Sequence, residues 1–97
     1  MHATFDLAHS RALADEAERR LAEHGLERVA GVPAPFMRAV ELPPGDAAEL
    51  WRRLYEEFHV EVPVFERDGR RLLRFSIGPY NDEEDVERLV TALRQLL

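Results

Sequence analysis

The chain has 97 residues, a formal net charge of −6 and no cysteine. This length fits one domain, residues 1–97, with a modest hydrophobic core, and the lack of cysteine excludes disulfides, thiolate metal sites and thiol nucleophiles. The acidic balance disfavours nucleic acid and anionic membranes as partners, and no apolar run approaches the roughly 20 residues of a membrane-spanning helix.

All thirteen basic residues are arginine, so the sequence contains no lysine. A Schiff base with a carbonyl cofactor or substrate requires a lysine amine. An enzyme of that kind would therefore need its lysine on another chain or segment. The start of the chain lacks the basic-then-apolar pattern of a signal peptide, so a cytoplasmic protein is expected.

The first predicted helix covers residues 4–24, with Thr4 as its N-cap and Gly25 as its left-handed C-terminal residue. His2 and His9 lie near or on this helix. Because no third ligand follows at a suitable spacing, we expect no metal site.

A short strand is predicted at residues 36–42, after a connector rich in glycine and proline. Both of its faces are largely apolar, which favours a covered strand over a fully exposed edge. The second helix starts at Asp46, which has capping-box spacing to Glu49. Its apolar stripe comprises Ala47, Leu50, Trp51, Leu54, Tyr55 and Phe58.

Trp51 and Tyr55 in this helix are open to two interpretations. Their spacing of four residues resembles a stacking platform for a ligand, but the continuing stripe favours packing in the core. His59 ends the helix, where we expect a cap rather than a catalytic base.

A hairpin follows, because Asp68-Gly69 is a preferred dipeptide for a two-residue type I′ turn. The turn pairs residues 60–67 with residues 70–77 in reverse order. An apolar face is predicted to lie under the helices, formed by Val60, Val62, Val64, Leu73, Phe75 and Ile77. The opposite face holds Glu61, Pro63, Phe65, Leu72, Arg74 and Ser76.

The last predicted helix covers residues 82–97, with Asn81 as N-cap and Glu84 at the capping-box position. Its acidic first turn suits the helix dipole and lacks the ligand spacing of a calcium loop.

The expected fold is therefore a two-layer α+β domain of order helix-strand-helix-strand-strand-helix, with a small, mainly antiparallel three-stranded sheet and helices on one face. No element remains to cover the other face, which carries Arg74 beside Phe65 and Leu72. Such a face is typical of a partner surface, and its arginine is suited to bind a carboxylate or phosphate through two hydrogen bonds.

Several short motifs from residue 50 onward occur together: Glu61-Val62-Pro63-Val64, Arg74-x-Ser76, Tyr80-Asn81, and Glu84-Asp85-Val86 with Leu89. With these motifs the segment resembles the C-terminal small domain of class V aminotransferases, which are fold-type I enzymes that depend on pyridoxal phosphate (PLP). The family includes cysteine desulfurases and isopenicillin N epimerase-like proteins. The short link HVEVPV is most similar to the epimerase-like branch.

The resemblance implies that Arg74 binds the α-carboxylate of an amino-acid-like substrate. It also implies that a large PLP domain or a homodimer partner lies against the open face of the sheet. The PLP domain, its lysine and its phosphate-binding loop are absent from this sequence. We therefore expect an isolated or truncated small domain with no catalytic, cofactor-binding or metal-binding residue of its own, inactive alone.

The alternative is a free-standing module that binds an acidic ligand or a partner protein through the open face around Arg74, Phe65 and Leu72. Self-association through the same face is a third interpretation.

Overall fold

The computed structural model describes residues 7–29, 37–78 and 81–97. Its elements, in chain order, are α1 (Leu7–Glu23), β1 (Met37–Leu42), α2 (Ala47–Phe58), β2 (Val64–Arg67), β3 (Arg70–Ser76) and α3 (Glu83–Leu96). This order confirms the predicted α+β class. Thr4, His2, Pro79 and Tyr80 lie outside the described residues.

The three strands form an antiparallel sheet in the order β1-β3-β2, so β3 lies in the centre. The predicted hairpin register is confirmed from Val64↔Leu73 to Arg67↔Arg70. At the turn, Asp68 and Gly69 have φ values of 54° and 77°, as a type I′ turn requires. Turn chemistry at two residues thus determines which side chains of the hairpin share a face.

The pairing of residues 60–62 with residues 75–77 was also predicted, but β2 begins only at Val64. The Arg74 N–H still bonds to the Pro63 carbonyl, at 3.0 Å. Residues 59 and 60 instead cap the C-terminus of α2. His59 is the C-cap residue and is left-handed, with φ of 57°, and the Val60 N–H bonds to the Leu54 carbonyl at 2.9 Å. The residues directly after α2 therefore form the C-terminal cap of the helix and do not pair with β3.

β1 lies at an edge of the sheet, but its outer side is not bare. The Val29 N–H bonds to the Ala39 carbonyl at 2.8 Å, and the Glu41 N–H bonds to the Glu27 carbonyl at 3.1 Å. The segment after α1 thus protects an edge that would otherwise expose unpaired backbone groups.

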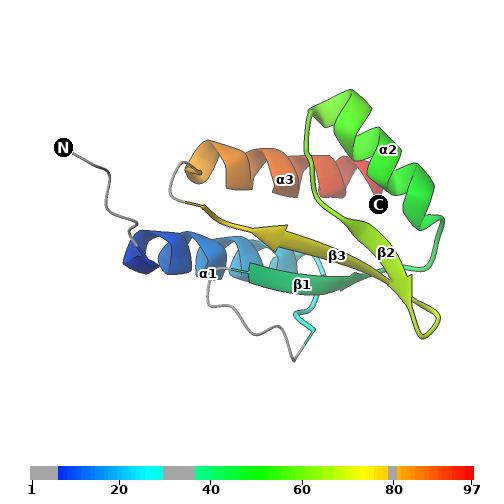
Figure 1. Ribbon diagram of the computed structural model, residues 1–97, viewed down its shortest axis with the longest axis horizontal. Helices are drawn as coiled ribbons and strands as arrows, with labels where there is room; N and C mark the ends of the chain where they lie inside the picture. The colour runs from blue at the N-terminus through cyan, green and yellow to red at the C-terminus, as the bar shows by residue number, and fades with distance from the viewer. Residues whose placement is uncertain (1–6, 30–36, 79–80) are drawn as a thin grey trace.

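The hydrophobic core lies between one face of the sheet and the helices. α1 and α3 run side by side, α1 contacts β1, and α2 packs beside β2 (Figure 1). The predicted apolar face of the hairpin, together with Val40 and Leu42 of β1, supplies the sheet's share of this core. The buried residues of the core, from the helices and the sheet together, include Leu13, Leu21, Val40, Leu50, Leu54, Leu73, Phe75, Leu89, Val90 and Leu93.

Of the four predicted helix ends that lie among the described residues, three are confirmed: Gly25, Asp46 and the C-cap His59. Gly25, with φ of 82°, ends α1 in a Schellman motif, in which the Leu26 N–H bonds to the Leu21 carbonyl at 3.0 Å. Asp46 caps α2 by accepting the Glu49 N–H at 3.1 Å.

The predicted N-cap of α3 was wrong by one residue. Asp82 is the N-cap and Asp85 completes the capping box, in place of Asn81 and Glu84. The Asn81 side chain is engaged elsewhere, because its Oδ1 accepts the Gly78 N–H at 2.7 Å and its Nδ2 donates to Asp85 at 3.0 Å. Asn81 therefore shapes the turn from β3 into α3 rather than the helix start itself.

Candidate functional site

Arg74 lies in the middle of the central strand, on the sheet face opposite the helices. Its cross-strand partner in β1 is Ala39, and on the β2 side its backbone bonds to Pro63. Short side chains on both sides leave the guanidinium exposed. Arg74 forms no ion pair within the described part of the chain, although Glu61 was predicted to lie on the same sheet face.

Arg70, on the same strand and face, provides a contrast. Its Nη2 lies 2.7 Å from Oε1 of Glu41. The hydrogen bond from Arg70 lowers the pKa of Glu41, and the same bond raises the pKa of Arg70. One arginine of this face is thus neutralised within the fold, whereas Arg74 forms no ion pair within residues 7–29, 37–78 and 81–97.

The open face is narrower than predicted, because Leu72 is only 2% exposed. Leu72 was expected to lie beside Arg74 without cover. It stands between Glu41 of β1 and Phe65 of β2, whose longer side chains flank it on both sides. Phe65 is itself half-buried, and Arg67 lies over its ring at 5.7 Å from the centroid. On this face of β3, Arg70, Arg74 and Ser76 are the exposed residues.

A second arginine of the sheet, Arg38, was missed by sequence reasoning. It faces α1 with a side chain only 9% exposed, and it contacts Asp15 at 2.6 Å and Glu18 at 3.1 Å. The signal was present: Arg38 has the same parity as Val40 in its strand, and the two acids are three residues apart on α1. These contacts make Arg38 a structural residue, since both of its partners belong to the fold.

The predicted core packing of Trp51 and Tyr55 was wrong, because they are 53% and 52% exposed. Leu50 and Leu54 take the core positions of α2, and each aromatic residue follows one of them, about 100° further round the helix. Both aromatic side chains line a groove of about 340 Å³ with Glu61, Val62 and Pro63.

The residues of this chain do not fit PLP on their own. With no lysine in the sequence, no side chain is able to hold the cofactor covalently. Among the described residues no group of three metal-ligating side chains comes together, and a ring nitrogen of His9 lies 3.2 Å from the Asn81 carbonyl instead. No helix in the described ranges is long and apolar enough to cross a membrane.

Comparison with known proteins shows which enzymes contain a segment similar to this chain. No protein-family model matches the chain. An isopenicillin N epimerase from Streptomyces clavuligerus is 40% identical over 94 residues, which cover 92% of this chain and 24% of the relative. A second isopenicillin N epimerase, from Amycolatopsis lactamdurans, is 48% identical over 61 residues, or 62% of this chain and 15% of the relative.

The chain is a homologue of the C-terminal part of isopenicillin N epimerases. It spans about a quarter of the length of the Streptomyces relative. The resemblance inferred from the motifs is therefore confirmed, and the S. clavuligerus match extends it beyond residues 50–97 to most of the chain.

Solved structures agree on the fold. The cysteine desulfurase CsdA from Escherichia coli has a TM-score of 0.71 at 24% identity, and the match covers 89% of this chain and 24% of that structure. A serine palmitoyltransferase from Sphingomonas wittichii has a TM-score of 0.68, also at 24% identity, over 91% of this chain and 23% of that one. These structural neighbours are PLP-dependent enzymes, and in each the chain matches a minor part.

Proposed function

We propose that this chain is the carboxylate-binding part of a PLP-dependent enzyme similar to isopenicillin N epimerase, and that Arg74 binds the substrate carboxylate. The observation that carries the proposal is the state of Arg74: an exposed guanidinium at the centre of the sheet, without an ion pair in the described part of the chain. A guanidinium binds a carboxylate through two parallel N–H···O bonds, which adds orientation to affinity.

The PLP-binding lysine belongs, in this proposal, to the complete enzyme. There the large PLP domain or a homodimer partner covers the open face around Arg74. The chain itself has the role of positioning and orienting an amino-acid-like substrate, and no proton-transfer step falls to its residues. This division agrees with the absence of lysine and with the share of 24% that the chain has of its Streptomyces relative.

A chimera tests the role of Arg74. In it, this chain replaces the matching C-terminal segment of the Streptomyces clavuligerus epimerase. Arg74→Ala should raise KM for the substrate by about 10- to 100-fold, because a charge-assisted hydrogen bond contributes about 1.5–3 kcal/mol. Arg70→Ala is the matched control and should leave KM within about twofold, since Glu41 already occupies that arginine.

An unchanged KM in the Arg74→Ala chimera would remove the proposed role. The isolated chain offers a second test. Mixed with PLP, it should show no absorbance band of a lysine-bound cofactor, and a stoichiometric band would contradict the division of roles.

The alternative function, a free-standing binding module, rests on the same exposed arginine. If this alternative holds, the isolated 97-residue chain should bind a dicarboxylate such as glutarate saturably. Arg74→Ala should abolish this binding, and Arg70→Ala should keep it. Calorimetry on the isolated chain separates the two functions, because the enzyme-part proposal expects strong carboxylate binding only in the assembled enzyme.

A further inference from the structure

The groove beside α2 is a second surface whose composition points to a ligand. Trp51 and Tyr55, both about half exposed, form one side of it, and Val62 and Pro63 line it from the segment that leads into β2. A pair of exposed aromatic side chains at neighbouring helical positions is costly to leave in water and typical of recognition surfaces. Arg74 is not among the described lining residues, but its backbone N–H bonds to the carbonyl of Pro63, so the groove adjoins the candidate carboxylate site.

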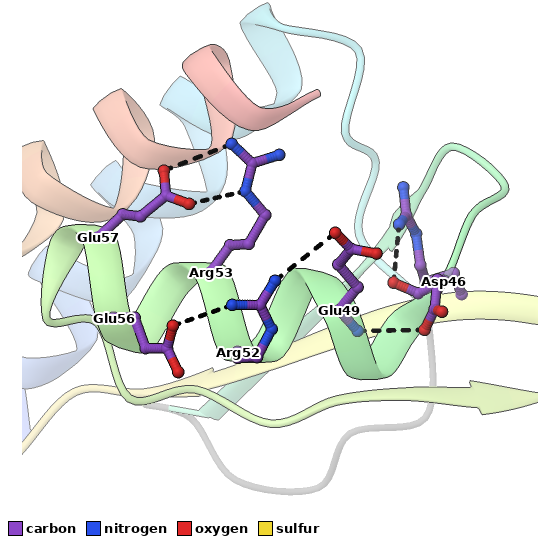
Figure 2. A network of polar contacts seen from close by, with 7 residues as sticks. Asp46, Glu49, Arg52, Arg53, Glu56 and Glu57 are labelled. Atoms are coloured by element: carbon purple, nitrogen blue, oxygen red, sulfur yellow. Dashed lines mark hydrogen bonds and ion pairs between the residues drawn. The ribbon is translucent and has the colours of Figure 1, made fainter.

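Glu61 supplies the charge of the groove. The acids of α2 are already paired: Arg52 contacts Glu56 at 2.9 Å and Glu49 at 3.6 Å, and Arg53 contacts Glu57 at 2.8 Å (Figure 2).

In contrast, Glu61 is exposed and forms no ion pair within the described ranges of the chain. Among the described residues that line the groove, Glu61 is the one with a charged side chain. The groove therefore presents two aromatic faces and a free carboxylate, and its described lining residues include no cation.

We propose that this groove binds an arginine side chain of a partner polypeptide. The negative faces of Trp51 and Tyr55 attract a cation, and a planar guanidinium stacks on them while it donates hydrogen bonds to the Glu61 carboxylate. Lysine satisfies the charge but not the stacking or the two-bond geometry, so arginine is favoured over lysine. An uncharged apolar side chain would leave Glu61 without a partner at the rim of the contact.

Binding to the isolated chain is measurable directly, because Trp51 is the single tryptophan of the sequence. The probe is the peptide acetyl-Gly-Arg-Gly-Arg-Gly-amide, titrated while the fluorescence of Trp51 is recorded. The matched control peptide carries citrulline in place of arginine, which keeps the planar shape and removes the charge. A lysine peptide of the same length completes the set.

The arginine peptide should change the fluorescence saturably and bind about fivefold or more tightly than either control peptide. Glu61→Gln and Tyr55→Leu should each weaken it by about fivefold. Glu49→Gln makes the same change in net charge at a site outside the groove and should leave binding unchanged, as should Arg74→Ala. Circular dichroism on each variant confirms that the fold is retained.

Three results would overturn the proposal. Equal binding of the citrulline peptide would make the groove an apolar contact surface without charge selection. Equal weakening by Glu49→Gln and Glu61→Gln would assign the binding to the overall negative charge. A fluorescence change that rises linearly with peptide, without saturation, would mean that no site is present.

Discussion

The two faces of the sheet each carry an arginine at neighbouring rungs of the β1–β3 ladder, and the two arginines differ in almost every respect. Arg38, opposite Phe75, points to the helices and is held by two carboxylates of α1. Arg74, opposite Ala39, lies on the other face, exposed and without an ion pair in the described part of the chain.

The difference follows from what each face can supply. A buried guanidinium must find carboxylates within the fold, because its desolvation costs several kcal/mol otherwise. An exposed guanidinium is solvated by water and needs no internal partner. The charge of Arg38 therefore holds α1 to the sheet, whereas the charge of Arg74 is exposed and forms no ion pair among the described residues.

The largest effect should come from Arg38→Ala. It removes the contacts of Arg38 with Asp15 and Glu18 and leaves a space between α1 and β1. The free energy of unfolding should therefore fall by about 2–4 kcal/mol, as measured by urea denaturation. Arg38→Met, which keeps the apolar stem in place, should cost less than the alanine variant. A loss below about 0.5 kcal/mol for Arg38→Ala would mean that the two faces do not differ in the way described.

Leu72→Ala tests how open the second face is. With Leu72 only 2% exposed, we expect a loss of about 2–3 kcal/mol in unfolding free energy, similar to that of Leu73→Ala on the core face. If Leu72→Ala costs less than about 0.5 kcal/mol, the face is open at this rung and the original sequence prediction holds.

Asp85 lies where β3 leads into α3, and its effect should depend on pH. Hydrogen bonds from Asn81 and from the Asp82 backbone hold the pKa of Asp85 below its ordinary value of 3.8. A lowered folded-state pKa gives stabilisation that is complete above the unfolded-state pKa and is lost as the pH falls through the folded-state pKa. Asp85→Asn should therefore cost about 1 kcal/mol near pH 6 and much less near pH 2.

Glu84→Gln is the control for that variant, and urea denaturation at both pH values measures the two. Glu84 makes no capping-box bond, so its replacement should cost only about 0.3 kcal/mol through the helix dipole. Equal losses for the two variants would argue for a cap one residue earlier.

The smallest effect on stability is expected from Arg74→Ala, within about 0.5 kcal/mol of the wild type at all salt concentrations. Arg70→Ala should lose a small contribution that disappears in high salt, because its ion pair with Glu41 is exposed. A marked destabilisation by Arg74→Ala would assign this residue to the fold and weaken its proposed role in carboxylate binding.

Much of the fold could be predicted because it depends on local chemistry. Asp68-Gly69 determined the hairpin register, and strand alternation then separated the core face from the face of Arg74. Apolar spacing located the helices, and Gly25 and Asp46 ended and began them as expected. The predicted N-cap of α3 was wrong by one residue, because Asn81 and Asp82 are both side chains suited to cap a helix.

The tertiary structure alone decided which side chains are covered. Trp51 and Leu54 both belong to the apolar stripe of α2, yet only Leu54 faces the sheet, since the width of the contact depends on where the helix docks. Arg38 required its carboxylates from a helix some twenty residues earlier in the sequence. Periodicity and turn residues thus determine faces and registers, whereas burial and ion pairing depend on contacts between distant segments.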